Sequence, residues 1–153
     1  MSIPQRFTLV TLGVADVEAS TAFYRRLGWR QSTHSVPGTT FFTTPGPVIA
    51  LWSTAELAVD AGRASTADAP VSAPPFRAVA LAVNFDSRDE VDAALADWQA
   101  AGGEVPKPVV ETEWGGYSGY GADPDGNLWE FAHNPFWPLD ERGMPQLDGG
   151  EVA

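Results

Sequence analysis

One order of secondary-structure elements occurs twice along this chain of 153 residues, and this repeat limits the possible folds more than any other feature. Residues 7–14 are rich in strand-forming residues and lead to Asp16, which can cap a helix that ends at Gly28. Three extended segments separated by turns follow, at residues 29–34, 39–43 and 48–52. The first half therefore predicts the order β-α-β-β-β.

The same order returns in the second half. A strand is expected at residues 77–85, and the capping box Ser87-Arg88-Asp89-Glu90 opens a helix that ends at Gly102-Gly103. Three more strands are expected at residues 104–111, 117–122 and 127–133. Two prolines in the first of these favour an edge strand, and Asp123 and Asp125 are typical turn residues.

Counting residues between matching features supports a duplicated unit. Val14 corresponds to Val83, Gly28 to Gly102 and Gly46 to Gly126. Either half alone would leave one face of its sheet uncovered, so we expect both to belong to one α+β domain. The predicted domain covers residues 1–135, with module one at about 6–52, a crossover at 53–76 that includes a helical turn near 55–61, and module two at about 77–135. Residues 136–153 form a C-terminal tail.

Charge and cysteine content exclude several classes of function. The formal net charge is −11, and residues 77–153 account for all of it. Nucleic acids and anionic membranes attract Lys and Arg, so neither is an expected partner. The absence of cysteine excludes disulfides, thiolate zinc sites and a cysteine nucleophile, and no signal peptide or membrane span is recognisable. We expect a cytoplasmic protein.

Three stretches of the sequence resemble the vicinal-oxygen-chelate superfamily, which includes glyoxalase I, extradiol dioxygenases and bleomycin-resistance proteins. They are Leu12-Gly13-Val14-Ala15-Asp16, Phe23-Tyr24-Arg25-Arg26-Leu27-Gly28-Trp29 and Ala122-Asp123-Pro124-Asp125-Gly126-Asn127-Leu128-Trp129-Glu130. With the duplicated order they cover the chain to about Pro135. The resemblance implies two βαβββ modules that curl a mixed sheet around a cleft, a small-molecule ligand, and a homodimer.

Metal-dependent members of that superfamily place His, Glu or Gln on the first and last strand of each module. Carried over to this chain, these positions hold Leu9, Ala50, about Ala78, and Glu130. One carboxylate cannot replace three or four converging ligands, so we expect no metal cofactor. His133 is three residues from Glu130 on a predicted strand and therefore faces the other way, and His34 is expected in a solvated loop.

Glu130 is the candidate catalytic residue. The resemblance places it on the cleft side of its strand, where a carboxyl can act as a general acid or base or bind a cationic or hydroxyl-bearing ligand. The alternative is a relict carboxylate that only accepts hydrogen bonds from a tyrosine or a backbone donor.

Aromatic residues are the other candidates for ligand contact. Trp114, Tyr117 and Tyr120 lie in a glycine-rich segment suited to a flat organic molecule, and Trp52 shares the face of Ala50. The alternative for all four is core packing, which is also the expectation for Trp129.

Three functions remain open from the sequence. The first is a metal-independent protein that binds a small aromatic or cationic molecule, as bleomycin-resistance proteins do. The second is a glyoxalase-like lyase or isomerase that uses Glu130 as an acid or base or as its last metal ligand. The third is a structural or regulatory partner whose cleft is filled by aromatic side chains.

Overall fold

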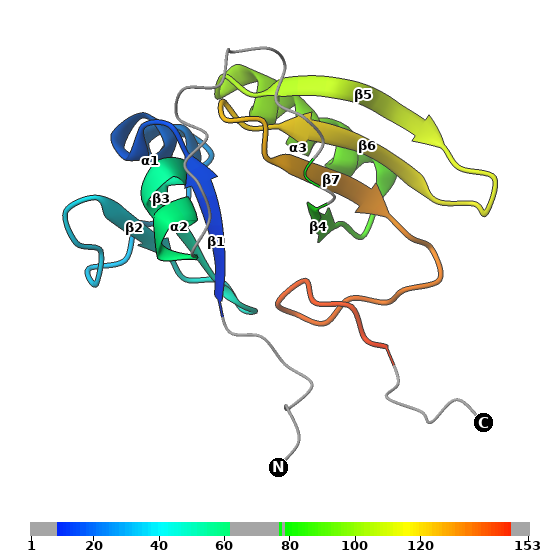
Figure 1. The fold of residues 1–153 in the computed structure, drawn as a ribbon. Coiled ribbons are helices and arrows are strands. Elements are labelled where there is room, and N and C mark those ends of the chain that lie inside the picture. The colour runs from blue at the N-terminus through cyan, green and yellow to red at the C-terminus, as the bar shows by residue number, and fades with distance from the viewer. Residues whose placement is uncertain (1–8, 62–76, 78, 148–153) are drawn as a thin grey trace. The chain divides into compact units, whose positions relative to one another are not determined.

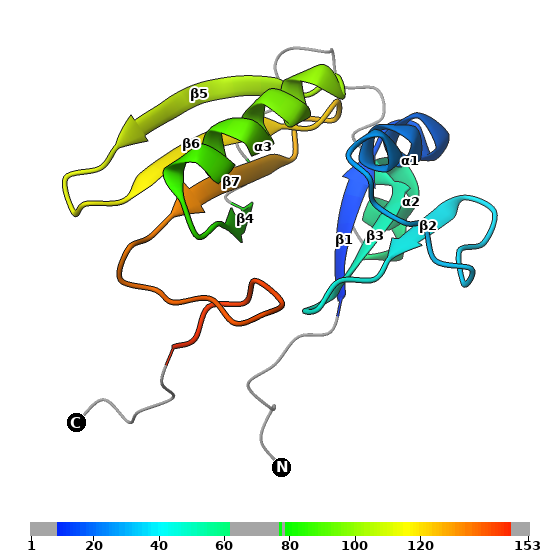
Figure 2. The same ribbon diagram turned by 180° about the vertical axis from the view of Figure 1, so that it is seen from behind.

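The computed structural model describes residues 9–61, 77 and 79–147, and the chain divides into two compact units, residues 1–75 and 76–153. Each unit contains one β-sheet with its own helices (Figures 1 and 2). The predicted α+β class is confirmed. Within the described ranges, every helix is too short or too polar to cross a bilayer.

The first unit has a three-stranded sheet. Its elements are β1 (Leu9–Val14), α1 (Val17–Arg26), β2 (Thr39–Phe42), β3 (Val48–Ser53) and α2 (Thr54–Asp60). β3 lies in the centre, parallel to β1 and antiparallel to β2. The last strand of the module thus pairs with its first strand.

Local sequence signals define α1. The side chain of Asp16 accepts a hydrogen bond from the N–H of Ala19 at 2.9 Å, and Gly28 follows the helix with a φ of +87°. Phe23 and Tyr24 are completely buried, and the Tyr24 ring lies 5.8 Å from that of Phe42. These aromatic contacts bury one side of α1 against the sheet.

Strand alternation divides the first sheet into two faces. Thr21 of α1 donates a hydrogen bond to Thr40 at 2.8 Å, and Thr40 pairs with the buried Leu51, so this face lies under α1. Ala50 and Trp52 alternate with Leu51 and point to the face that α1 does not cover.

The predicted strand at 29–34 is wrong. Only Gln31 forms a β-bridge there, to Phe42, and the chain then turns. The Ser32 hydroxyl accepts a hydrogen bond from the N–H of His34 at 3.1 Å, a local bond that competes with strand pairing. Module one therefore has three strands and a single bridge where the fourth was expected.

The second unit has the four strands that were predicted. Its elements are β4 (Ala80–Asn84), α3 (Arg88–Ala100), β5 (Glu104–Glu111), β6 (Tyr117–Ala122) and β7 (Leu128–His133). The sheet order is β4-β7-β6-β5, with β4 and β7 parallel and the other pairs antiparallel. As in the first unit, the first and last strands are neighbours, so the duplication extends to sheet topology.

Helix α3 covers one face of this sheet (Figure 2). Its predicted capping box is present: Ser87 accepts from the N–H of Glu90, and Glu90 accepts from the N–H of Ser87 at 2.9 Å. Val91, Leu95 and Trp98 are buried beneath it. The Trp98 ring contacts those of Phe131 at 5.2 Å and Trp129 at 6.2 Å, which confirms Trp129 as a core residue.

Strand β5 lies at the edge of the sheet, as its prolines predicted. Its register against β6 shifts on both sides of Lys107, between Glu104 and Val110. Prolines and bulges hinder the pairing of a further strand at such an edge.

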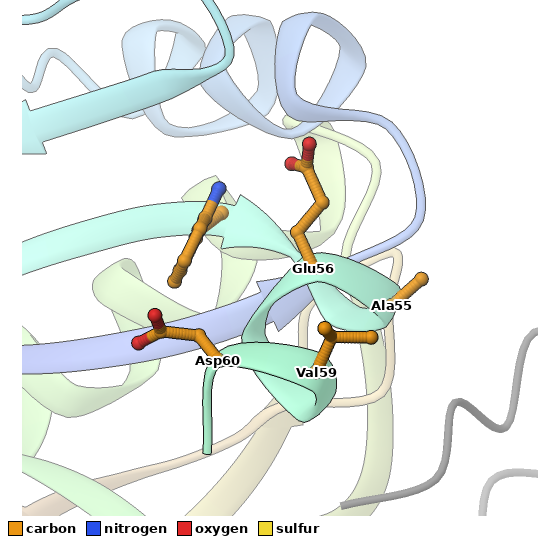
Figure 3. Close-up of a pocket in the computed structure, with 5 residues that line it drawn as sticks. Ala55, Glu56, Val59 and Asp60 are labelled. Atoms are coloured by element: carbon orange, nitrogen blue, oxygen red, sulfur yellow. The ribbon is translucent and has the colours of Figure 1, made fainter. Parts of the chain in front are cut away.

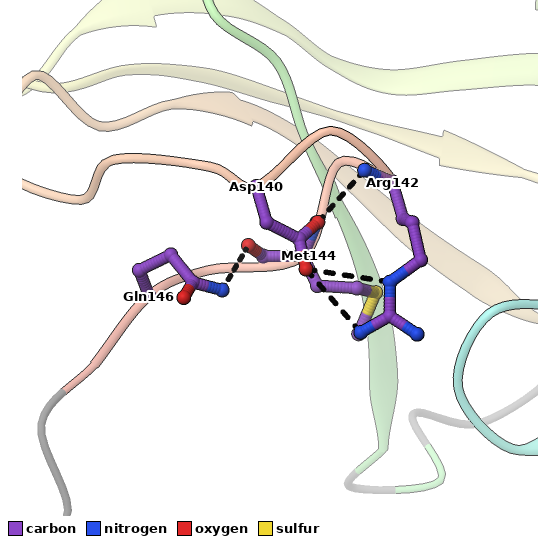
Figure 4. A network of polar contacts seen from close by, with 4 residues as sticks. All are labelled: Asp140, Arg142, Met144 and Gln146. Atoms are coloured by element: carbon purple, nitrogen blue, oxygen red, sulfur yellow. Dashed lines mark hydrogen bonds and ion pairs between the residues drawn. The ribbon is translucent and has the colours of Figure 1, made fainter.

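The described part of the tail forms a small hairpin around Asp140 (Figure 4). Leu139 and Pro145 form a β-bridge, and the Asp140 carboxylate accepts from the N–H groups of Met144 at 2.9 Å and Arg142 at 2.8 Å. The bond from Met144 is the main reason that the pKa of Asp140 is lowered, and the Arg142 backbone and side chain add to it.

We expect this hairpin to loosen in acid. Because the pKa of Asp140 is lower in the folded chain than in the unfolded chain, its stabilisation is present above the ordinary carboxyl pKa and is lost as the pH falls through the lowered value. Carboxyl NMR should show Asp140 titrating below its usual range. Arg142→Ala should preserve most of that shift, because the Met144 bond remains. An Asp140 titrating normally would contradict this account.

Candidate functional site

Glu130 lies in the middle of β7, on the face of the sheet that α3 does not cover. Its neighbours Trp129 and Phe131 both contact Trp98 of α3, so the side chain between them points to the opposite face. It is half-buried, and its cross-strand partners are Ala82 on β4 and Tyr120 on β6. We call this the open face of the second sheet.

Tyr120 and Lys107 continue the row that begins at Glu130. Lys107 pairs with Tyr120 across β5 and β6, and its Nζ atom lies 5.9 Å from the centre of the tyrosine ring. Burial, and secondly the negative charge of Glu130, raise the pKa of Tyr120. The row therefore offers a neutral phenol beside a carboxylate and a cation. Such groups can orient a polar ligand or transfer a proton.

This coupling can be measured directly. Glu130→Gln should lower the pKa of Tyr120 because it removes the nearby negative charge, yet the pKa should stay above the ordinary tyrosine value because burial is the larger cause. The readout is an alkaline titration of the tyrosine ring by NMR. Glu104→Gln, an exposed position on edge strand β5, makes the same charge change as a control. An unchanged Tyr120 pKa in Glu130→Gln would refute the coupling.

Tyr117 does not join this row. It lies on the α3 side of the sheet by strand alternation, and its hydroxyl donates to the Asp92 carboxylate at 2.9 Å. Arg88 lies over its ring at 5.3 Å from the centre. The hydrogen bond to Asp92 is the main reason that the pKa of Tyr117 is raised.

Trp114 also lies away from Glu130. It is in the turn between β5 and β6 and is 52% exposed. Its ring occupies the space that a side chain at Gly116 would need. The structure therefore brings together Tyr120 and Glu130 among the predicted ligand residues of this unit, and separates Tyr117 and Trp114 from them.

The glycines of this segment serve core packing, the alternative considered from the sequence. A Cβ at Gly121 would lie 2.6 Å from Nε1 of Trp98, and one at Gly119 would lie 2.9 Å from the backbone nitrogen of Val109. Because these glycines have no side chains, the indole of Trp98 packs against Gly121 and the backbone of β5 lies close to Gly119.

Trp52 lies in the first unit and borders a shallow hollow of about 370 Å³ (Figure 3). The other lining residues come from α2: Ala55, Glu56, Val59 and Asp60. The helical turn near 55–61 was predicted, and the Ser53 hydroxyl caps it by accepting from the N–H of Glu56 at 3.4 Å. Glu56 and Asp60 were not predicted as site residues, although their spacing of four places them on one side of a helix.

Apart from Glu130, the positions that carry metal ligands in the resembling superfamily lack donor atoms here. Leu9 pairs with Val48 on β3, and Ala50 pairs with Thr11 on β1. Ala78 lies outside the described residues. The helix N-caps give a different counterpart. Leu9 lies seven residues before Asp16, the N-cap of α1, and Ala80 lies seven residues before Ser87, the N-cap of α3. Ala80 is therefore the counterpart of Leu9. By the same spacing from the N-cap, Val14 corresponds to Phe85 and not to Val83.

These residues do not fit a metal of that kind. Leucine and alanine side chains cannot ligate, and the Nδ1 atom of His133 is hydrogen-bonded to the carbonyl of Phe85 at 2.9 Å. His34 is exposed in its turn. Across residues 9–61 and 79–147, three or more His, Asp or Glu side chains nowhere converge as a metal site would require.

Solved structures similar to this chain include glyoxalase-related proteins. A glyoxalase-related enzyme from Fulvimarina pelagi is 36% identical, with a TM-score of 0.80 over 94% of this chain and 99% of that one. A glyoxalase/bleomycin resistance protein/dioxygenase from Nocardioides is 29% identical, with a TM-score of 0.66 over 100% and 92%. Lactoylglutathione lyase from Agrobacterium tumefaciens is 22% identical, with a TM-score of 0.64 over 90% and 100%, and shares the fold.

The search of curated proteins found no match. The family model described as Glyoxalase/Bleomycin resistance protein/Dioxygenase superfamily matches residues 6–131. That match spans both β-α-β repeats, from the strand before α1 to the strand that carries Glu130. The chain belongs to the glyoxalase/bleomycin resistance protein/dioxygenase superfamily.

Proposed function

We propose that this protein binds a small aromatic or cationic organic molecule without a metal cofactor, as a cytoplasmic homodimer. The observation that carries the proposal is the pairing of Glu130 with Tyr120 on the open face of the second sheet. Small residues surround the pair: Ala82 beside Glu130, and Ser118 and Ala132 in the next row. A carboxylate and a phenol in such surroundings suit a ligand with an amine or hydroxyl group and a flat ring.

The lack of donor atoms at Leu9, Ala50 and Ala80 supports metal independence. Divalent transition metals are held by three or four converging protein ligands, and the corresponding positions here supply one carboxylate. Binding by the open face would therefore depend on shape, ring contacts and hydrogen bonds.

A thermal-shift screen tests the proposal. The panel contains Ni²⁺, Zn²⁺ and Mn²⁺ and a set of aromatic amines, alcohols and quaternary ammonium compounds. A ligand present at 100 times its Kd stabilises the folded state by about 2.7 kcal/mol, so binding should raise Tm measurably. We expect organic compounds to raise Tm and metals to leave it unchanged. Glu130→Gln should reduce the organic shift, and the exposed control Glu104→Gln should preserve it.

The alternative function is a glyoxalase-like lyase or isomerase that uses Glu130 as an acid or base or as its last metal ligand. Its support is the 36% identity to a glyoxalase-related enzyme and the coupling between Glu130 and the Tyr120 hydroxyl. Metal-dependent stabilisation, or turnover of lactoylglutathione that Glu130→Gln abolishes, would establish the enzyme in place of the binder. Stabilisation by neither class would contradict both functions.

A further inference from the structure

The hollow beside Trp52 combines an aromatic wall with two carboxylates. Ala55 and Val59 lie one turn apart on α2, and Glu56 and Asp60 lie one turn apart on the adjacent stripe of the helix (Figure 3). Trp52 contributes the indole from the strand just before the helix. The lining residues that the structure describes all lie within residues 52–60 of the first unit.

The chemistry of these five residues favours a positive ligand. Both acids are exposed at the rim, and among the described residues that line the hollow there is no basic side chain. An indole face attracts cations more strongly than any other aromatic side chain does. A hydrated metal ion would gain little from alanine, valine and indole, whereas an organic cation can use both the apolar wall and the carboxylates.

We propose that this hollow binds an organic ammonium ion that carries an aromatic ring. The cationic head lies against the Trp52 indole between Glu56 and Asp60, and the ring lies along Ala55 and Val59. The volume of about 370 Å³ admits a single-ring compound. The inference rests on the proposed function, because it names the ligand class of a small-molecule binder, but its residues are independent of Glu130.

Calorimetric titration of the full chain with three probes tests this site. Benzyltrimethylammonium has a ring and a charge, benzyl alcohol has the ring alone, and tetramethylammonium has the charge alone. We expect benzyltrimethylammonium to bind at least about fivefold more tightly than either of the others, because it uses both halves of the hollow. Its affinity should fall as salt is added, because the two carboxylates are exposed.

Substitutions in the hollow test whether benzyltrimethylammonium binds there. The double variant Glu56→Gln/Asp60→Asn should weaken benzyltrimethylammonium at least about fivefold, since both attractive charges are removed. Trp52→Leu should weaken it similarly, and Trp52→Phe should weaken it less because a ring is kept. Glu18→Gln, which removes one carboxylate charge at an exposed position of α1 in the same unit, should have no effect.

Several outcomes would overturn the inference. They are equal affinity for the charged and uncharged ring compounds, unchanged affinity in the double variant, and an equal loss in Glu18→Gln. Loss of binding in Glu130→Gln with full binding in the double variant would place the ligand at Glu130. That result would reject the hollow but support the proposed function. Loss of binding in the double variant, with full binding in Glu130→Gln, would support the hollow as the binding site. The thermal-shift screen would then test the role of Glu130 separately.

Discussion

Trp98→Ala is expected to lower the free energy of unfolding by about 3–5 kcal/mol, the usual cost of removing a buried large aromatic side chain. Trp98 is 3% exposed, and its Nε1 atom donates to the carbonyl of Ala122 at 3.1 Å. Its ring also fills the space left by Gly121 and contacts Phe131. The variant would leave a cavity between α3 and the two strands that carry Tyr120 and Glu130.

Trp114→Ala provides a matched control. It removes the same side chain from an exposed turn of the same unit, so its cost should be much smaller. Trp98→Phe keeps a ring but loses the hydrogen bond to Ala122, and about 1–3 kcal/mol is expected. Urea unfolding followed by far-ultraviolet circular dichroism measures all three. Equal midpoints for Trp98→Ala and Trp114→Ala would show that α3 packing does not stabilise this unit.

Capping and breaking residues explain why most of the fold could be predicted. Asp16 and Ser87 cap helices through bonds to neighbouring backbone groups, and Gly28 and Gly102 end them with positive φ. These signals act over a few residues and need no tertiary information. The predicted strand at 29–34 was wrong because strand formation there depends on a partner strand: pairing stops after the Gln31 bridge and the bond from the N–H of Ser32 to the carbonyl of Phe41, and the Ser32 hydroxyl then accepts a local bond from the N–H of His34.

The candidate site could be predicted only in part, since it depends on register. Glu130 and Tyr120 were both selected by residue type, but only the pairing of β6 with β7 makes them neighbours. The same register places Tyr117 on the opposite face, beside Asp92. Glu56 and Asp60 were missed because the segment after Trp52 was assigned as a crossover, although their spacing places them on one side of its helical turn. A residue's chemistry can be read from sequence, whereas its neighbours depend on tertiary structure.

Asp123→Ala is expected to destabilise the chain by about 2–3 kcal/mol, because its carboxylate is 3% exposed and accepts three hydrogen bonds. The donors are the N–H of Asp125 at 3.0 Å, the N–H of Asn127 at 2.8 Å and the Asn127 amide at 2.9 Å. These bonds confirm Asp123 as a turn residue. The turn joins β6 to β7, so it also supports the register that pairs Tyr120 with Glu130.

Two further variants distinguish the loss of the hydrogen bonds in this turn from the loss of a negative charge. Asp123→Asn keeps one carbonyl oxygen for the two backbone donors but places its amide NH₂ group, a donor, opposite the donating amide of Asn127. A smaller loss than for alanine is therefore expected. Asp97→Ala, at an exposed position of α3, should change stability by no more than about 0.5 kcal/mol. If Asp123→Ala matched Asp97→Ala in urea unfolding, the three hydrogen bonds would not stabilise the turn. If the turn sets the register, Asp123→Ala should also bring the Tyr120 pKa closer to its ordinary value, because Glu130 would no longer be held opposite it.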